Sequence, residues 1–295
     1  MNLRAVFPPM PTPFLDGEIH TSAISGNIQR WMDAGLGGAL VLGTNGEAPL
    51  VDDDEADRVV EAARRAVPAN RTLLVGAGRE STRATIAAVK RAAAGGADAV
   101  VVRTPSLYRA HTPPPAIFTH YTAVADASPV PVLLYNYPAF TGINLAPDLI
   151  GRLAEHENIV GVKETSTDGG QFAEMASLVP ERFTIMSGSA PGAFAALCAG
   201  ARGAILAVAC VAPESCVELM HLTLSGRPAE ALAIQQRLMS LARAVTTGFG
   251  IAGLKAALDL AGYFGGDPRP PLRPLASDGV ETIRTLLEGL HAPVN

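Results

Sequence analysis

Eight short apolar runs, each followed by a helix-like stretch, constrain the fold of this chain more than any other feature. Their residues are apolar at consecutive positions, which is typical of strands in a parallel sheet covered on both faces, because half-exposed strands alternate apolar and polar residues. The runs are AVFPPM from Ala5, GALVLGT from Gly38, TLLVGAG from Thr72, AVVVRTP from Ala99, VPVLLYN from Val130, IVGVKET from Ile159, FTIMSGS from Phe183 and GAILAVA from Gly203. We therefore predict an α/β fold with a parallel sheet.

Helical patterns separate these runs, among them DEADRVVEAARRAV, TRATIAAVKRAAAGG and PDLIGRLAEH. Asp52 and Glu55 match the capping box of a helix start. Eight strand–helix units in about 220 residues fit a closed (β/α)8 barrel, and a doubly wound open sheet is the alternative. Only helical periodicity remains after the eighth run. The prediction is a (β/α)8 TIM barrel over residues 1–225, followed by a C-terminal helical extension over residues 226–295.

The balance of charge excludes several kinds of partner. The 295 residues carry 23 basic and 28 acidic side chains, with no run of Lys or Arg, so neither nucleic acid nor a membrane surface is an expected partner. The longest apolar stretch, GAILAVACVAP, is shorter than the about 20 residues that span a bilayer. Three cysteines without CxxC spacing, and an opening segment without the apolar core of a signal peptide, predict a cytoplasmic location.

In a parallel barrel, functional side chains come from the carboxyl ends of strands and from the loops that follow them. Those positions hold hydroxyls, an amide and one amine: Thr44, Asn45, Thr104, Tyr108, Tyr135, Lys163, Thr165, Ser187 and Ser189, with Gly188 between the two serines. The six histidines are scattered without metal-ligand spacing, so we expect no metal site. GAGRES lacks the third glycine of a dinucleotide fingerprint and supports such a site only weakly.

Lys163 ends an apolar run, where a charged side chain is costly to bury. A neutral lysine attacks a ketone and forms an iminium, an electron sink that lets an adjacent carbon–carbon bond form or break while hydroxyls move protons. Desolvation in a barrel mouth lowers a lysine pKa from about 10.4 to roughly 7. The structural alternative is a snorkelling or ion-paired lysine with Glu164 as its nearest partner, beside tyrosines that serve only as packing residues.

Four motifs in the same order as these strand ends resemble the dihydrodipicolinate synthase and N-acetylneuraminate lyase superfamily of class I aldolases. GTNGEAPL resembles its GTTGE or GSNGE loop, and YNYPAFTGINL resembles its tyrosine motif. GVKETS is similar to its Schiff-base lysine segment, and SGSAPG to the glycine loop that follows. The resemblance runs almost end to end. It implies a (β/α)8 barrel with a C-terminal helical extension, assembled as a homotetramer that is a dimer of dimers.

The resemblance also implies a role for each matching residue. Lys163 corresponds to the nucleophile that forms a covalent Schiff base, so no separate cofactor is expected, and Tyr135 to the phenol that transfers protons. Thr44 and Asn45 would bind the carboxylate of pyruvate. Tyr108 matches a tyrosine that the family offers across a dimer interface to the neighbouring site. The remaining residues expected to bind substrate or line the site are Thr165, Gly188, Ser189 and Phe140.

Two departures from the family pattern bear on the substrate. Dihydrodipicolinate synthases carry an arginine two residues after the proline of the tyrosine motif, and this chain has Phe140 there, which cannot form a bidentate pair with a carboxylate. Asn45 replaces the second loop threonine and interrupts the hydroxyl relay. The chain is more similar to 4-hydroxy-2-oxoglutarate aldolases, which also lack the arginine, in GTNGE, STRATIAAV, HYTAVADASPVPVLLYN and FGIAGLKAALDLAGYFGG.

These comparisons of motifs predict a pyruvate-dependent class I aldolase, a lyase that cleaves or forms a 4-hydroxy-2-oxo acid from pyruvate and an aldehyde. Dihydrodipicolinate synthase (4-hydroxy-tetrahydrodipicolinate synthase) activity and a 2-keto-3-deoxy sugar acid aldolase or dehydratase are the enzymatic alternatives. A catalytically idle barrel that binds a keto acid is the alternative outside enzymes. Retention of both Lys163 and Tyr135 speaks against an idle barrel.

Overall fold

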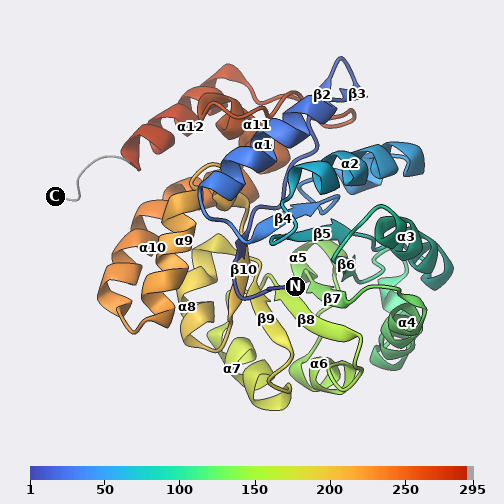
Figure 1. Ribbon diagram of the computed structural model, residues 1–295. Helices are drawn as coiled ribbons and strands as arrows, with labels where there is room; N and C mark the ends of the chain where they lie inside the picture. The colour runs from blue at the N-terminus through green and yellow to red at the C-terminus, as the bar shows by residue number, and fades with distance from the viewer. Residues whose placement is uncertain (291–295) are drawn as a thin grey trace.

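The computed structural model describes residues 1–290, and within that range eight parallel strands form a ring (Figure 1). Each strand falls within one of the eight apolar runs, so the predicted strands are confirmed. The parallel strands are β1 (Val6–Phe7), β4 (Gly38–Val41), β5 (Thr72–Gly76), β6 (Ala99–Arg103), β7 (Val132–Asn136), β8 (Ile159–Glu164), β9 (Thr184–Ser187) and β10 (Gly203–Ile205).

The ring is closed through β1, which lies between the last strand and the first long one. On one side Val6 and Phe7 pair with Ala204 and Ile205 of β10. On the other side Leu40 of β4 donates its backbone N–H to the carbonyl of Pro8 at 3.0 Å, and its own carbonyl accepts from the N–H of Met10 at 2.8 Å. The predicted closed (β/α)8 barrel is therefore correct, and the open doubly wound sheet is wrong.

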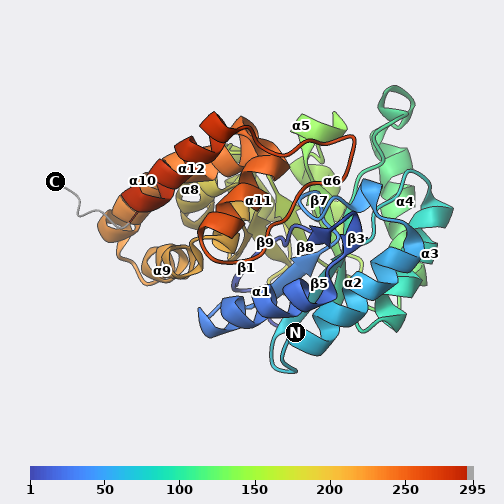
Figure 2. The same ribbon diagram turned by 90° about the horizontal axis from the view of Figure 1, so that it is seen from above.

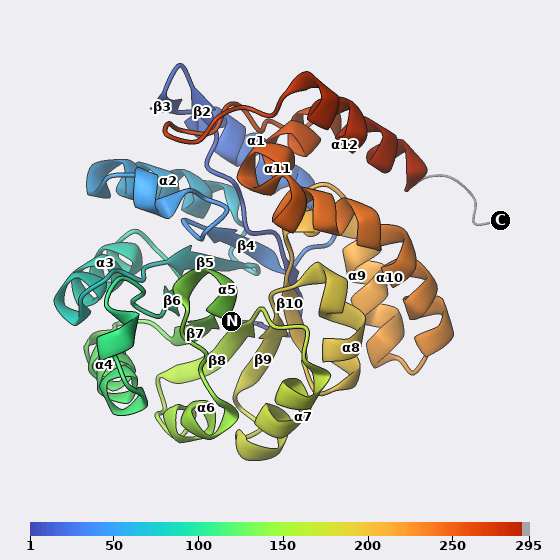
Figure 3. The ribbon, with the colours of Figure 1, turned by 180° about the vertical axis from the view of Figure 1, so that it is seen from behind.

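Helices surround the strands on the outside of the ring, except for the single-turn helix after β7, which lies over one end of the ring (Figures 1 to 3). Those that follow the strands are α1 (Thr21–Asp33), α2 (Asp53–Ala66), α3 (Thr82–Ala94), α4 (Pro114–Ala127), α5 (Pro138–Thr141), α6 (Pro147–Leu153), α7 (Gly169–Leu178), α8 (Ala193–Cys198) and α9 (Pro213–Leu224). Asp52 caps α2 as predicted, since its carboxylate accepts the N–H of Glu55 while the Glu55 side chain accepts the N–H of Asp52.

Short 3-10 turns and one π-helical turn occupy several of the connecting loops. The 3-10 turns are η1 (Ala48–Leu50), η2 (Arg109–His111), η3 (Ala190–Gly192) and η4 (Ala207–Cys210), and η5 (Ala244–Gly248) is a π-helical turn. The turns η1 to η4 each follow a barrel strand at its carboxyl end, where the candidate functional residues lie.

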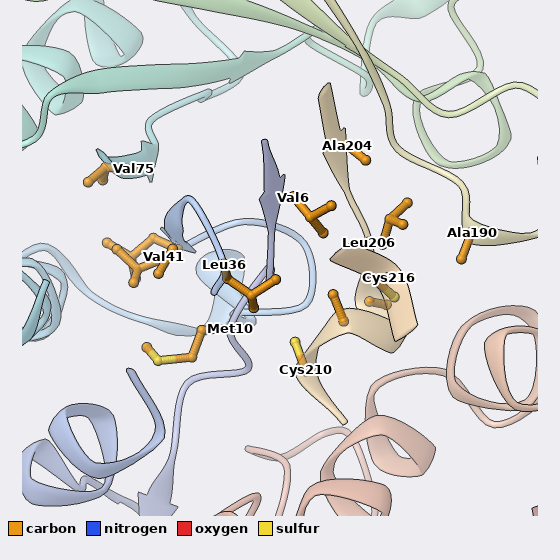
Figure 4. Packing of buried hydrophobic residues seen from close by; sticks show 14 of the residues in the cluster. Val6, Met10, Leu36, Val41, Val75, Ala190, Ala204, Leu206, Cys210 and Cys216 are labelled. Atoms are coloured by element: carbon orange, nitrogen blue, oxygen red, sulfur yellow. The ribbon is translucent and has the colours of Figure 1, made fainter. Parts of the chain in front are cut away.

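The core has two layers because successive residues of a strand face opposite sides of the sheet. Inside the barrel lie Phe7, Leu40, Leu74, Val101, Leu133, Met186 and Ile205, together with Tyr135. The alternate residues pack outward against the helices, and Figure 4 shows part of that layer, which includes Val6, Val41, Leu206, Cys210 and Cys216. All three cysteines are free thiols in the structure.

A small hairpin before α1 was not predicted. Strands β2 (Phe14–Leu15) and β3 (Glu18–Ile19) pair antiparallel around Asp16 and Gly17, both with positive φ. Asp-Gly is the sequence signal of such a two-residue turn, because both central residues need the left-handed region. The flanking strands are two residues long, too short to show an alternating pattern.

The C-terminal segment is helical, as expected. It contains α10 (Pro228–Arg243), α11 (Gly250–Leu260) and α12 (Ser277–Gly289). These helices stack on one side of the barrel beside α1 and α9 (Figures 1 and 3). The boundary at residue 225 falls in the turn between α9 and α10, and the division into two domains stays a prediction. No helix in residues 1–290 has the length and apolar character needed to cross a membrane.

Candidate active site

Lys163 lies near the carboxyl end of β8, on the face of the strand that looks into the barrel mouth. Its side chain is only 5% exposed. It pairs in register with Tyr135 of β7 and Met186 of β9, two residues of the inner layer. The Lys163 Nζ lies 4.2 Å from the centroid of the Tyr135 ring. The structure therefore brings together the amine and the phenol that the sequence pattern paired.

Glu164, the nearest acidic neighbour in the sequence, does not serve as an ion-pair partner of Lys163. It faces the other side of β8, where its Oε2 accepts hydrogen bonds from Asn136 Nδ2 at 2.7 Å and Gln171 Nε2 at 2.9 Å. Its Oε1 accepts the backbone N–H of Ser166 at 2.7 Å. Within residues 1–290 no carboxylate pairs with Lys163. The interpretation of Lys163 as a structural ion-pair residue is therefore wrong.

The pKa of Lys163 falls to about 7, because burial penalises the charged ammonium, while the Cys210 thiol has a smaller effect in the opposite direction. About half of the amine is thus neutral at pH 7, against about one part in a few thousand for a free lysine. The face of the Tyr135 ring favours the charged form by about 1 to 2 kcal/mol, which offsets part of the burial penalty.

Tyr135 links Lys163 to the loop after β4 on the other side of the barrel mouth. Its hydroxyl lies 3.4 Å from Thr44 Oγ1, and either group can donate the hydrogen bond. Burial raises the pKa of Tyr135, so the group remains a neutral phenol at pH 7 and can pass a proton only by exchanging one. Amine, phenol and threonine hydroxyl form one connected set.

Gly188 is required by the close approach of its neighbours. A Cβ at this position would lie 2.7 Å from Thr165 Cγ2 and 3.1 Å from Lys163 Cε. The Thr165 hydroxyl donates to the carbonyl of Asn136 at 2.8 Å, so its methyl group, and not its oxygen, faces Gly188. Asn45 and Ser189 are half-buried in the loops after β4 and β9.

Tyr108 and Phe140 lie on two projecting segments on the carboxyl side of the strands. Figure 2 shows α5, which carries Phe140, and the segment before α4, which carries Tyr108, extending beyond the body of the barrel. Tyr108 is 68% exposed and Phe140 is 69% exposed. The Phe140 ring packs edge-on against Tyr137, with 4.4 Å between the ring centroids. In the described part of one chain Tyr108 makes no hydrogen bond through its hydroxyl to Tyr135 or Lys163.

A buried ion pair holds the loop of Thr44 and Asn45 from below, and the sequence pattern did not reveal it. Lys255 Nζ on α11 lies 2.8 Å from Glu47 Oε1, and the two side chains are 1% and 0% exposed. Lys255 also donates to the carbonyl of Thr12, whose hydroxyl donates to the carbonyl of Gly46 at 2.6 Å. A lone lysine in the apolar helix GIAGLKAALDLAG was the available signal.

A second missed pair anchors the segment that carries Tyr108. Glu80 accepts the backbone N–H groups of Ser106 and Leu107, both at 2.9 Å, and its Oε1 lies 2.8 Å from Arg103 Nη2. Burial raises the pKa of Glu80, but these hydrogen bonds outweigh burial and hold it at about 2. The carboxylate is therefore charged throughout the neutral range. Within residues 1–290 no group of three or more side chains could hold a metal ion.

A buried amine among hydroxyls at the carboxyl ends of the strands of a (β/α)8 barrel suits covalent chemistry on a carbonyl group. The model of the Dihydrodipicolinate synthetase family matches residues 2–290, and the chain belongs to this family. Relatives in the family are named as synthases and aldolases, and the chain is an aldolase-type lyase.

The similar proteins cover almost the whole chain. A 4-hydroxy-tetrahydrodipicolinate synthase of Thermotoga neapolitana is 34% identical, over 96% of this chain and 97% of its own. An L-threo-3-deoxy-hexylosonate aldolase of Hypocrea jecorina is 38% identical, over 90% of this chain and 88% of its own. A prophage protein of E. coli K12, solved in complex with pyruvate, matches with a TM-score of 0.90 and 30% identity, over 97% of both chains.

Proposed function

We propose that this lyase forms a Schiff base between Lys163 and pyruvate, and that it cleaves or forms a 4-hydroxy-2-oxo acid. The observation that carries the proposal is the state of Lys163: its amine is buried, has no carboxylate partner among residues 1–290, and lies against the ring of Tyr135. A structural lysine at such a depth is normally paired. The pyruvate in the similar E. coli structure supports the choice of keto acid.

In the synthetic direction, the neutral amine of Lys163 adds to C2 of pyruvate, and loss of water leaves an iminium. The iminium withdraws electrons, so a proton leaves C3 and an enamine forms. The enamine carbon attacks the carbonyl carbon of an aldehyde, whose oxygen takes up a proton and becomes the 4-hydroxyl group. Water then releases the 2-oxo acid and regenerates the amine. Cleavage follows the same steps in reverse, and no external cofactor is needed.

The surrounding residues suit the proton transfers and the carboxylate. Tyr135 can carry protons between the reacting atoms and the Thr44 hydroxyl 3.4 Å away. Thr44 and Asn45 offer a hydroxyl and an amide to the pyruvate carboxylate, while Thr165, Gly188 and Ser189 line the opposite side of the site. We further propose that a neighbouring subunit supplies Tyr108, within a homotetramer, since one chain leaves this ring exposed.

Phe140 bears on which aldehyde the site accepts. It stands at the position where dihydrodipicolinate synthases carry an arginine, and its exposed phenyl ring cannot make a bidentate bond to a carboxylate. This favours a 4-hydroxy-2-oxoglutarate-like acid over 4-hydroxy-tetrahydrodipicolinate synthesis, although several relatives carry the latter name. The second candidate is a 3-deoxy sugar acid, supported by the 38% identical aldolase. Both candidates are 4-hydroxy-2-oxo acids.

Borohydride trapping tests the covalent step. Protein incubated with pyruvate and reduced should gain one pyruvate-derived mass, and peptide mapping should place it on Lys163. Lys163→Ala should lose the adduct and remain folded. The absence of an adduct in the wild type would leave only a binding barrel. If the adduct forms, a panel of glyoxylate, glyceraldehyde and aspartate semialdehyde identifies the aldehyde by product formation.

A further inference from the structure

Arg103 places a guanidinium in the same layer of the barrel mouth as the proposed catalytic residues. It is the last residue of β6, two residues beyond Val101, which faces the barrel interior. Because strand side chains alternate, Arg103 faces the same side as Val101. It pairs in register with Tyr135, which in turn pairs with Lys163. Arg103, Tyr135 and Lys163 therefore form one row across three neighbouring strands.

The stem of Arg103 is fixed by its contacts with the end of β5. A Cβ on Gly78 would lie 2.8 Å from Arg103 Cγ, so the missing side chain at Gly78 makes room for the arginine. Arg103 Nη1 donates to the carbonyl of Thr104 at 3.0 Å, and Nη2 pairs with Glu80 at 2.8 Å. The side chain is 27% exposed, which is low for an arginine.

The pair with Glu80 leaves part of the positive charge of Arg103 uncompensated. The Glu80 carboxylate also accepts two backbone N–H groups and the hydroxyl of Ser106 at 3.1 Å, so its charge is shared among four donors. A guanidinium has five N–H donors, and among residues 1–290 two of the three nitrogens of Arg103 have partners. An anion in the mouth of the barrel can use the rest.

We propose that Arg103 binds the carboxylate of the aldehyde substrate and so makes this site select a 2-oxo acid aldehyde of the glyoxylate class. The inference rests on the proposed function and names the substrate class of that same site. Phe140 occupies the position that would otherwise supply the cation. Arg103 supplies one from β6, on the same inner face as Tyr135.

The distances along the row fit a substrate of this size. Neighbouring strands lie about 4.8 Å apart, so the backbones of Arg103 and Lys163 are separated by roughly 10 Å. A five-carbon dicarboxylic acid joined to Lys163 at C2 extends its second carboxylate away from the amine. Under the proposal, the long side chain of Arg103 reaches this carboxylate across the remainder of that gap. A three-carbon sugar aldehyde has no charge for it to bind.

The structural alternative is that Arg103 only anchors the segment that carries Tyr108, through its pair with Glu80. Steady-state kinetics with pyruvate and either glyoxylate or neutral D-glyceraldehyde distinguish carboxylate binding from anchoring. Under the anion role, Arg103→Leu lowers kcat/KM for glyoxylate by about 10- to 100-fold, as expected for loss of a charge-assisted hydrogen bond, and changes it little for glyceraldehyde. Arg103→Lys restores part of the glyoxylate activity.

The matched control is Arg79→Leu. Arg79 is 30% exposed and pairs with Asp53 of α2, outside the barrel, so its loss should affect both aldehydes equally and weakly. An equal loss with both aldehydes in Arg103→Leu would show that Arg103 acts only as an anchor and would overturn the proposal. Borohydride trapping with pyruvate is run on each variant. If Arg103→Leu forms the adduct and keeps the wild-type preference between glyoxylate and glyceraldehyde, only the role of Arg103 is refuted. If the wild type forms no adduct, the aldolase itself is refuted.

Discussion

The two buried lysines should respond in opposite directions to the same substitution. Lys163 is buried without a carboxylate partner among residues 1–290, whereas Lys255 is buried against Glu47 at 2.8 Å. Methionine has a similar length and no charge. We expect Lys163→Met to raise the free energy of unfolding at pH 7 and Lys255→Met to lower it. This contrast is expected because the proposed function gives the first lysine a chemical role, whereas the second is paired with Glu47.

The magnitude for Lys163 follows from its pKa. Burial lowers this pKa from 10.5 to about 7, and each pKa unit corresponds to about 1.4 kcal/mol between the folded and unfolded states. At pH 7 the buried amine therefore costs about 4 kcal/mol of stability. Lys163→Met should thus be more stable than the wild type at pH 7 by up to about 4 kcal/mol.

The sign depends on pH in a defined way. Between the folded pKa near 7 and the unfolded value of 10.5, the unfolded state binds more protons, so the wild type gains stability as the pH rises. Lys163→Met lacks this dependence. The difference between the two proteins should therefore be largest at or below pH 7 and should vanish by about pH 10.5.

Lys255→Met removes one partner of a fully buried pair. Glu47 would keep the backbone N–H of Arg269 as a donor but would lose its cation. Breaking such a pair costs about 3 to 5 kcal/mol, because the remaining charge stays desolvated. The loop of Thr44 and Asn45 should loosen at the same time, since the carbonyl of Thr12 also loses its bond from Lys255.

Urea denaturation at pH 7 and pH 10 measures both effects. Trp31 is the sole tryptophan and is fully buried, so its fluorescence reports unfolding. Lys90→Met is the matched control, because Lys90 is the third lysine and is exposed on α3; its effect should stay within about 0.5 kcal/mol. Destabilisation of Lys163→Met at pH 7 would refute the reasoning and favour a structural Lys163.

Three further substitutions probe the site. Tyr135→Phe keeps the ring against Lys163 but removes the hydroxyl near Thr44, so turnover should fall by about 10²- to 10⁴-fold while pyruvate still binds; unchanged turnover would exclude the phenol as a proton carrier. Gly188→Ala introduces a Cβ 3.1 Å from Lys163 Cε, so the rate of borohydride-trapped adduct formation should drop in a protein with a near-wild-type circular dichroism spectrum. We expect the wild type to use aspartate semialdehyde poorly and Phe140→Arg to raise activity with it; efficient wild-type turnover of that substrate would contradict the argument from Phe140.

The fold was predictable because its signals are local and repeated. Each of the eight strands lies in a short apolar run, and the regular alternation of eight such runs with helical patterns identifies them as buried parallel strands. The hairpin at Asp16 was missed because its strands are two residues long and show no period. Lys163 and Tyr135 were predictable as a pair because both end strands that are adjacent in a parallel barrel.

The supporting contacts were not predictable, because they join residues that are far apart in the sequence. Glu47 and Lys255 lie more than 200 residues apart, and only the packing of α11 against the start of the chain brings them together. Arg103 and Glu80 lie 23 positions apart on neighbouring strand ends. Lys255 stands out as a lone lysine in an apolar helix, but nothing in the sequence near any of these residues identifies its partner.

The register of β6, β7 and β8 bears on which aldehyde the site selects. Arg103, Tyr135 and Lys163 end three adjacent strands and face the same way, so a substitution at one of them changes what the substrate meets without changing the packing of the outer layer. Phe140 instead lies on α5, outside that row. Under the proposal, β6 supplies the cation that α5 lacks at Phe140. Selectivity for an anionic aldehyde should then follow the residue at position 103 more closely than the residue at position 140.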